Sequence, residues 1–363
     1  MIRADVVGSL LRPEALKRAW AAREAGELGA VDYKAIEDRA VDAAVALQCD
    51  CGLDVVTDGE MRRFAFYGHL IDCVEGFDKL GGWAIAFRDE AGNETRLERP
   101  VAMSRLRRRR HLCAEEYAYL RARSDRATKV TLVSAQQAAA YWDPEKSRGA
   151  YPTLEAYLAD VVDILRDEVA ELARQGCRYV QIDAPQYAGL LDPAIRAGYQ
   201  RRGSDPDALL DRCIELDDAV IGDGLRAGIT FGLHLCRGNN DSKFYASGGY
   251  DPIASRVFRG TRFQRLLLEY DDARSGGFAP LRFVPDDRVV VLGLVTTKKP
   301  ELEPAADLER RIREAAQVVP LERLALSPQC GFASTMQGNR LSESDQAAKL
   351  RRVAEVARAV WGR

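Results

Sequence analysis

The sequence has almost no net charge, few histidines and no long apolar run. Its 53 lysines and arginines are balanced by 55 aspartates and glutamates, which leaves a net charge of −2. Overall charge therefore gives no attraction to nucleic acid or to an anionic membrane, and we expect neither as a partner. No run approaches the roughly 18 apolar residues of a membrane span, and the N-terminus lacks the apolar core of a signal peptide. These absences predict a cytoplasmic protein that acts on small molecules.

Cysteine is also sparse, with eight residues in a chain of 363. A chain of this length can bury a large core without disulfides, and cysteines in the cytoplasm stay reduced. The thiols are then available as metal ligands. The only histidines are His69, His111 and His234, so histidine chemistry has few places to occur.

One stretch of sequence combines these scarce residues. Residues 229–237 form an apolar run that ends in His234 and Cys236. We interpret the run as a buried strand, on which side chains two positions apart point the same way. The same tripeptide recurs at His111 and Cys113, but there it opens a helical pattern, on which side chains two apart diverge by about 200°. The sequence therefore favours His234 and Cys236 as a pair of metal ligands.

Apolar runs alternate with amphipathic helical patterns along the chain. The expected strands are residues 4–9, 53–59, 129–134, 179–185, 229–236, 266–271, 289–295 and 323–331. The expected long helices are residues 13–25, 33–51, 154–175, 205–227, 307–318 and 343–361. Strands that alternate with helices pair in parallel, and this number of units predicts a (β/α)8 barrel of the TIM type that occupies residues 1–363 as one domain. A doubly wound open α/β sheet is the alternative.

Two segments interrupt the alternation. Residues 75–110 show strand-like alternation with turn residues at Ala91, Gly92 and Asn93, which predicts a β-hairpin insertion after the second strand. Residues 238–261 are rich in glycine, asparagine, aspartate and serine, which predicts a long loop with a short helix over the barrel mouth. The second segment would cover the end of a barrel where reactive groups collect.

Polar residues follow nearly every expected strand, as a site assembled from many strand ends requires. His234, Cys236 and Cys330 offer one imidazole and two thiols, the donors that Zn²⁺ takes in tetrahedral sites. Cys330 ends the last expected strand and can close on the fifth. Glu269, at the end of the sixth, could fill the fourth position. A carboxylate that a substrate displaces makes such a site catalytic, whereas four permanent protein ligands make it structural.

The order of these motifs resembles the catalytic barrel of cobalamin-independent methionine synthase over residues 4–361. The matching pieces are Gly-Ser near the start, Asp-Gly-Glu, Ile-Asp-x-Pro, His-x-Cys, a later Glu, and Cys within Ser-Pro-x-Cys-Gly. The resemblance implies a single-barrel member of that family. It implies zinc on His234, Cys236, Glu269 and Cys330, a thiol-substrate pocket lined by Gly8 and Ser9, and a substrate ammonium bound by Glu60 and Asp183.

The resemblance also implies a mechanism. A free thiol has a pKa of about 8.5, and zinc coordination deprotonates it, so a homocysteine-like substrate thiol can attack a methyl or alkyl donor and give a thioether. The predicted activity is a zinc-dependent S-methyl or S-alkyl transfer, with Glu269 as the ligand that the thiol displaces. A homodimer is expected only from the frequency of dimers among soluble proteins.

The chain departs from the family pattern in ways that leave the donor open. The family's proton-donating histidine is absent from residues 295–300, and Ala184 stands where the family has glutamate. A methylfolate nitrogen must be protonated to leave, so Lys298 or water would have to take that role. A corrinoid could replace folate as the donor, or an epoxide could alkylate another thiol, as in epoxyalkane to coenzyme M transferases. The zinc could instead be structural in a barrel without activity, or the chain could resemble the related decarboxylase barrel, which has no metal.

Overall fold

The computed structural model describes residues 1–362 and has a mixed α/β fold around one parallel sheet. Six strands of the sheet pair in the order β12-β11-β10-β9-β8-β7, all in parallel. Nearly all of their residues are buried, as expected for apolar strands that are covered on both faces. Their bounds are Val130–Val133 (β7), Tyr179–Asp183 (β8), Thr230–Leu235 (β9), Arg265–Glu269 (β10), Val289–Val295 (β11) and Leu324–Pro328 (β12).

Backbone pairing also links the two edge strands of this sheet through the N-terminal part of the chain. Ala4 forms a parallel bridge with Leu326 of β12, and the Asp54 N–H donates to the Ala4 carbonyl at 3.0 Å. Strand β1 (Val55–Val56) then pairs with β6 (Ala127–Thr128), which leads directly into β7. The pairing order therefore returns from β12 to β7.

The prediction of a strand over residues 4–9 was wrong, because this segment forms only a single bridge, at Ala4. The cause lies at Asp5, whose side chain accepts a hydrogen bond from the Val6 N–H at 2.8 Å. It also accepts from Lys129 at 2.8 Å and from Arg265 at 3.0 Å, and it is fully buried. Bonds from a side chain to its neighbouring backbone compete with ladder pairing.

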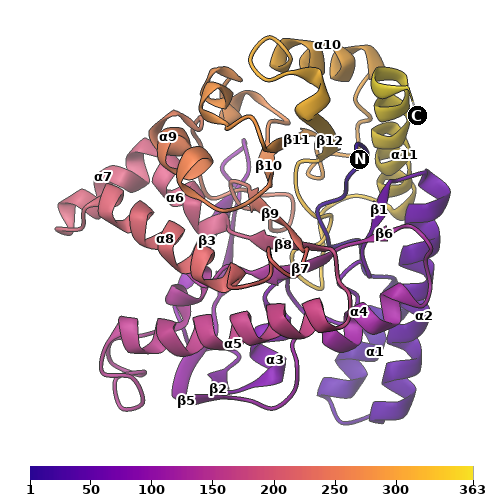
Figure 1. Ribbon diagram of the computed structural model, residues 1–363. Helices are drawn as coiled ribbons and strands as arrows, with labels where there is room; N and C mark the ends of the chain where they lie inside the picture. Colours follow the sequence, from indigo (N-terminus) through magenta and orange to yellow (C-terminus); the bar gives the residue numbers. More distant parts are fainter. Residues whose placement is uncertain (363) are drawn as a thin grey trace.

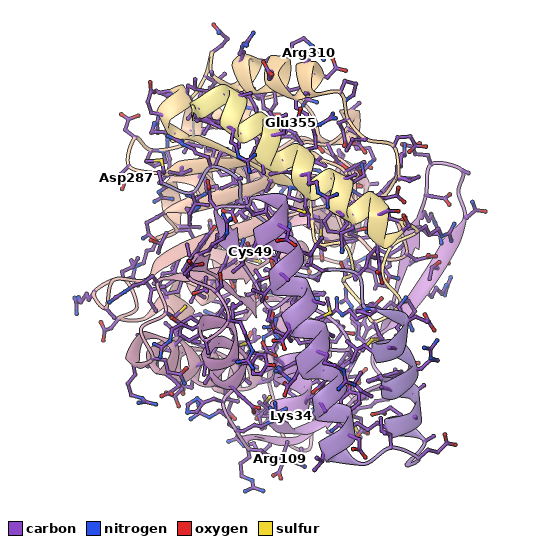
Figure 2. All side chains as sticks on the ribbon, turned by 90° about the vertical axis from the view of Figure 1, so that its right-hand side faces the viewer. Lys34, Cys49, Arg109, Asp287, Arg310 and Glu355 are labelled. Atoms are coloured by element: carbon purple, nitrogen blue, oxygen red, sulfur yellow. The ribbon has the colours of Figure 1, made fainter. Side chains whose placement is uncertain are left out.

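Helices surround the strands on the outside (Figure 1), and the six expected helices are confirmed to within a few residues at most ends. The clearest shortening is in α8, which ends at Ile221 rather than near residue 227, because Gly222 adopts a positive φ of 51°. Figure 2 shows α2, which carries Lys34 and Cys49, and α11, which carries Glu355, on the same side of the molecule. The longer helices are α1 (Glu14–Glu24), α2 (Ala30–Cys51), α4 (Ala114–Arg121), α5 (Leu154–Arg174), α7 (Pro193–Arg201), α8 (Pro206–Ile221), α9 (Asp251–Gly260), α10 (Ala305–Ala315) and α11 (Glu343–Trp361), and the shorter ones are α3 (Gly68–Cys73) and α6 (Ala188–Leu191).

The segment expected as one hairpin contains two antiparallel pairs. Strand β2 (Val74–Asp78) pairs with β5 (Val101–Arg108), and β3 (Ala84–Arg88) pairs with β4 (Glu94–Glu98). The backbone of Arg88 exchanges hydrogen bonds of 2.7 and 3.0 Å with that of Phe244. The hairpin β3–β4 is therefore hydrogen-bonded to the long loop that precedes α9. Helix α9 is the short helix that was expected within residues 238–261.

Candidate metal centre

Three side chains from two strand ends converge in the structure. His234 lies near the end of β9, Cys236 directly follows that strand, and Cys330 follows β12. Their ligand atoms all lie within 4.8 Å of one another, and each residue is buried. Among residues 1–362 they form the one group of three or more histidine, cysteine or acidic residues with this spacing. Parallel strands direct their carboxyl ends to the same edge, which explains how residues almost 100 positions apart meet.

The ring of His234 is held by Asp183, at the end of β8. Its Nδ1 lies 2.8 Å from Asp183 Oδ1, which also accepts from the Gln181 amide at 2.7 Å. Burial disfavours the charged imidazole, but the hydrogen bond to Asp183 and the charge of Cys236 together raise the pKa of His234. With Nδ1 bonded to a carboxylate, Nε2 is the nitrogen left to bind a metal.

The two thiols share one hydrogen bond. That bond lowers the pKa of Cys236 to about 7, helped by the nearby His234, and it raises the pKa of Cys330 well above its ordinary value. The Gly238 N–H also donates to the Cys236 sulfur at 3.4 Å. Two cysteine sulfurs and one imidazole are thus gathered in a buried position, a donor set that suits a borderline-soft ion such as Zn²⁺.

Glu269, at the end of β10, lies outside this group of three. Its Oε2 accepts from the Arg237 N–H at 2.6 Å, and its Oε1 from Arg274 at 3.2 Å and Lys298 at 3.3 Å. It is fully buried, and its charge, like the burial of the thiol, opposes the lowering of the Cys236 pKa. The structure therefore brings together three of the four expected ligands, with Glu269 held nearby by cations.

Lys298 follows β11 and is also ion-paired. Its ammonium lies 3.2 Å from Asp271 and 3.3 Å from Glu269. Burial opposes its charge, but the two carboxylates raise its pKa overall. It lines a charged hollow together with Arg274 and Lys299, separate from the pocket that Cys236 lines. Lys298 therefore lines a different pocket from the two thiols.

A pocket opens above the three candidate ligands. Ser9, Glu60 and Asp183 are among the residues that line it, whereas Gly8 is not. A Cβ at Gly8 would stand 2.7 Å from Glu60 Oε1 and 2.8 Å from the methyl group of Thr131. Gly8 therefore allows Glu60 to occupy its position.

Glu60 is a buried carboxylate of this pocket, and one of its oxygens has no hydrogen-bond partner among the described residues. Its Oε1 accepts from the Thr131 hydroxyl at 2.8 Å, while its Oε2 is buried without a partner. Burial raises its pKa to about 7, although Arg63, at 3.8 Å, favours the charged form. Its backbone has a positive φ of 55°, an uncommon conformation that is typical of functional sites.

Sequence reasoning missed the apolar wall of this pocket. Strand β3 contributes Ile85 and Phe87 to the wall, β4 contributes Leu97, and Arg99 directly follows β4 at the same alternation. Side chains two apart on a strand share a face, so this alternation could have identified them. The remaining apolar and aromatic wall residues are Val7, Phe66, Tyr67, Tyr141, Pro185 and Tyr245.

Known proteins resemble this chain over most of its length. Residues 2–358 match the family described as the catalytic domain of cobalamin-independent synthase. The chain is 38% identical to the uncharacterized protein YxjH of Bacillus subtilis over 99% of its own length and 94% of that protein. It is 24% identical to methionine synthase of Pyrococcus abyssi, covering 92% and 86% of the two chains. The crystal structure of a putative vitamin-B12 independent methionine synthase from Listeria monocytogenes superposes with a TM-score of 0.74 at 28% identity, covering 99% and 98% of the two chains. The chain belongs to the family of the cobalamin-independent synthase catalytic domain.

Proposed function

We propose that the protein is a zinc-dependent S-methyl or S-alkyl transferase that acts on a homocysteine-like thiol. The observation that carries this proposal is the convergence of His234, Cys236 and Cys330 beneath a pocket that contains Glu60. Relatives named methionine synthase support the reaction class. The return of strand pairing from β12 to β7 supports a closed (β/α)8 barrel, with residues 1–363 as one domain and residues 75–110 inserted after its second strand.

The three side chains fit zinc by their chemistry. Three protein ligands leave a fourth position for a substrate, as in catalytic zinc sites. Glu269 would take that position when no thiol is bound, and Arg274 and Lys298 would receive it when it is displaced. The bound ion supplies one function, which is to lower the pKa of a substrate thiol so that it reacts as a thiolate at neutral pH.

The residues above the metal would bind the amino acid part of the substrate. The free oxygen of Glu60 is a ready acceptor for an ammonium group, and Asp183 adds a second negative charge beside it. Ser9 lines the same pocket and would contact the substrate's other polar groups. Together these contacts would orient the thiol towards the metal and exclude other thiols.

The remaining step is attack of the sulfur on the donor carbon, which forms a thioether. A folate, a corrinoid and an epoxide are the donors that the family resemblance suggests. For a leaving group that needs a proton, Lys298 would be the donor; its hydrogen bond to Glu269 supports that role, while its raised pKa makes it a weak acid.

Metal analysis and a thiol titration test the proposal. Protein purified without chelator should carry about one zinc per chain, and homocysteine should release protons when it is added. His234→Ala and Cys330→Ser should lose the metal and remain folded, while Cys49→Ser, a change at a half-buried cysteine of α2, should keep it. Unfolding of the first two variants would indicate a structural zinc site instead. A wild-type protein without zinc would refute the proposal.

We also propose that the protein works in the cytoplasm. In the part of the chain that the structure describes, all eight cysteines carry free thiols, as a reducing compartment requires. Within the same residues no helix is both long and apolar enough to cross a membrane.

A further inference from the structure

Five aromatic residues line the pocket beside the candidate metal ligands. The Tyr67 ring lies 5.1 Å from that of Phe66 and 5.4 Å from that of Tyr141, between ring centroids. On another part of the wall, the rings of Phe87 and Tyr245 are 5.9 Å apart. Aromatic faces are negatively polarised, so a group of several rings attracts a cation that carries methyl groups in place of hydrogen-bond donors.

The same wall contains a guanidinium group without a partner. Arg99 directly follows β4, is half-buried, and makes no side-chain hydrogen bond or ion pair with any residue in 1–362. Burial raises the pKa of Tyr67 to about 12, and the positive charge of Arg99 opposes that rise, which indicates that the two groups are close. Most other arginines that line pockets here are paired, such as Arg62 with Asp38 at 2.5 Å and Arg274 with Asp272 at 2.6 Å. A half-buried guanidinium without a partner is suited to a carboxylate, which it can bind through two hydrogen bonds.

The aromatic rings favour a cationic group and Arg99 favours an anionic one, so a ligand that contacts both should carry both charges. A simple cation would be repelled by Arg99, and a simple anion would gain nothing from the rings. A zwitterion with a methylated cationic centre and a carboxylate satisfies both. Glu60 and Asp183 are not needed for this ligand, because under the proposed function they bind the ammonium of the thiol substrate.

We infer that the alkyl donor is a methylated onium carboxylate, a sulfonium or quaternary ammonium compound whose carboxylate binds Arg99 and whose methylated centre lies against Phe66, Tyr67, Phe87, Tyr141 and Tyr245. This inference rests on the proposed transferase function and names the class of its second substrate.

The chemistry of such a donor balances without an added acid. The substrate's thiolate sulfur forms a bond to the methyl carbon, and the bond from that carbon to the positive sulfur or nitrogen breaks. The electron pair of the broken bond stays on the leaving atom, which departs as a neutral thioether or tertiary amine. The leaving group takes up no proton, so the chain needs no histidine in residues 295–300.

Binding can be measured without the metal and without turnover. Isothermal titration of the metal-free protein would use 3-(dimethylsulfonio)propanoate, glycine betaine and, as a probe without a carboxylate, trimethylsulfonium. Arg99→Met should weaken both zwitterions about tenfold or more, the loss of a charge-assisted contact, and should leave trimethylsulfonium bound at least as tightly, because the guanidinium that repels a simple cation is gone. Arg96→Met is the matched control, because Arg96 lies on β4 but is exposed and paired with Glu94 at 2.7 Å. Phe87→Leu should weaken all three ligands. Equal binding of the zwitterions by wild type and Arg99→Met would overturn the inference.

Transfer is then followed with the zinc-loaded protein, homocysteine and donors that carry a CD3 group, by mass spectrometry of the thioether. Labelled product from the sulfonium or from the betaine supports the inference and identifies the leaving atom. Product from methylcobalamin or methyltetrahydrofolate but from neither onium compound overturns it and leaves the proposed function intact. No product from any donor, with no proton release on addition of homocysteine, means that the proposed function itself is wrong.

Discussion

Asp183 Oδ1 lies 2.8 Å from Nδ1 of His234, and both residues are buried where β8 and β9 end. The family resemblance implies that Asp183 binds a substrate ammonium. Its contact with His234 gives it a second task, because a carboxylate on Nδ1 fixes the orientation of the ring and makes Nε2 a better metal ligand. Metal affinity should therefore depend on Asp183.

Asp183→Asn tests this contact. The amide keeps the size of the side chain but removes its charge, so zinc affinity should fall about 10- to 100-fold, measured by competition with a chromophoric chelator. The fold should be preserved, as judged by circular dichroism. Asp223→Asn, at a side chain 87% exposed, is the control and should bind zinc like the wild type. Unchanged affinity in Asp183→Asn would show that the hydrogen bond does not tune the metal site.

The titration of Glu60 gives a pH dependence with a defined sign. Burial raises its pKa from 4.5 to about 7, with Asp183 adding to the rise and Arg63 and Arg12 opposing it. At pH values between these two pKa values, Glu60 holds its proton more tightly in the folded protein than in the unfolded chain. The free energy of unfolding should therefore fall as pH rises through this window. Glu60→Gln should remove about 1–3 kcal/mol of that fall between pH 5 and 8, measured by urea denaturation.

The same group should control ligand binding with the opposite sign. An ammonium is attracted to the ionised form of Glu60, so its binding should strengthen as pH rises through about 7. Methionine is a suitable probe, because it has the ammonium of a homocysteine-like substrate but no thiol that titrates. Titration calorimetry of the metal-free protein should show this pH dependence in the wild type and a flat, weaker profile in Glu60→Gln. A pH dependence that survives in the variant would mean that another group binds the ammonium.

The sequence predicted the part of the site that depends on strand ends. His234 and Cys236 follow one apolar run and Cys330 another, and parallel pairing is sufficient to bring such positions together. It did not predict the contacts that depend on side-chain competition. Glu269 could be placed at a strand end, but only the structure shows that Arg274 and Lys298 hold it in ion pairs.

Among helices and strands, too, features that depend on nearby residues were predictable and those that depend on distant contacts were not. Helix α11 was predictable because Ser342 and Asp345 form a capping box whose residues are close in sequence. The single bridge at Ala4 in place of the strand expected over residues 4–9 was not predictable, because pairing there is limited by contacts of Asp5 with Lys129 and Arg265, which are distant in sequence. The aromatic wall was missed because its residues come from separate segments of the chain, and only the alternation in β3 and β4 indicates a shared face.

Lys298 should be more important for stability than an exposed lysine. Its ammonium pairs with Asp271 and Glu269, and all three side chains are buried. Lys298→Met leaves two buried carboxylates with fewer partners, which should cost about 3–5 kcal/mol of unfolding free energy, measured by chemical denaturation. Addition of Asp271→Asn should restore part of the loss. The neighbouring Lys299→Met, at a side chain 57% exposed and paired with Glu90, should change stability by less than about 0.5 kcal/mol. Equal midpoints for the two single variants would contradict the importance of this ion pair.

Gly331, directly after Cys330, should control the position of Ser9. A Cβ at Gly331 would stand 2.0 Å from the Ser9 hydroxyl and 3.2 Å from its Cβ, so Ser9 must move if alanine replaces glycine. Ser9 lines the pocket proposed for the thiol substrate. Gly331→Ala should therefore raise the KM for homocysteine about tenfold or more, as small misplacements in a binding site do.

The control for this change is Gly277→Ala, because a Cβ there meets no atom within 4 Å. It should leave both the KM and the zinc content unchanged. Zinc content distinguishes two explanations for a loss of activity in Gly331→Ala. If Ser9 moves alone, the variant keeps about one zinc per chain and binds methionine more weakly than the wild type does. If the variant loses its zinc instead, the added methyl group has displaced Cys330, and Ser9 is not the residue through which Gly331 acts.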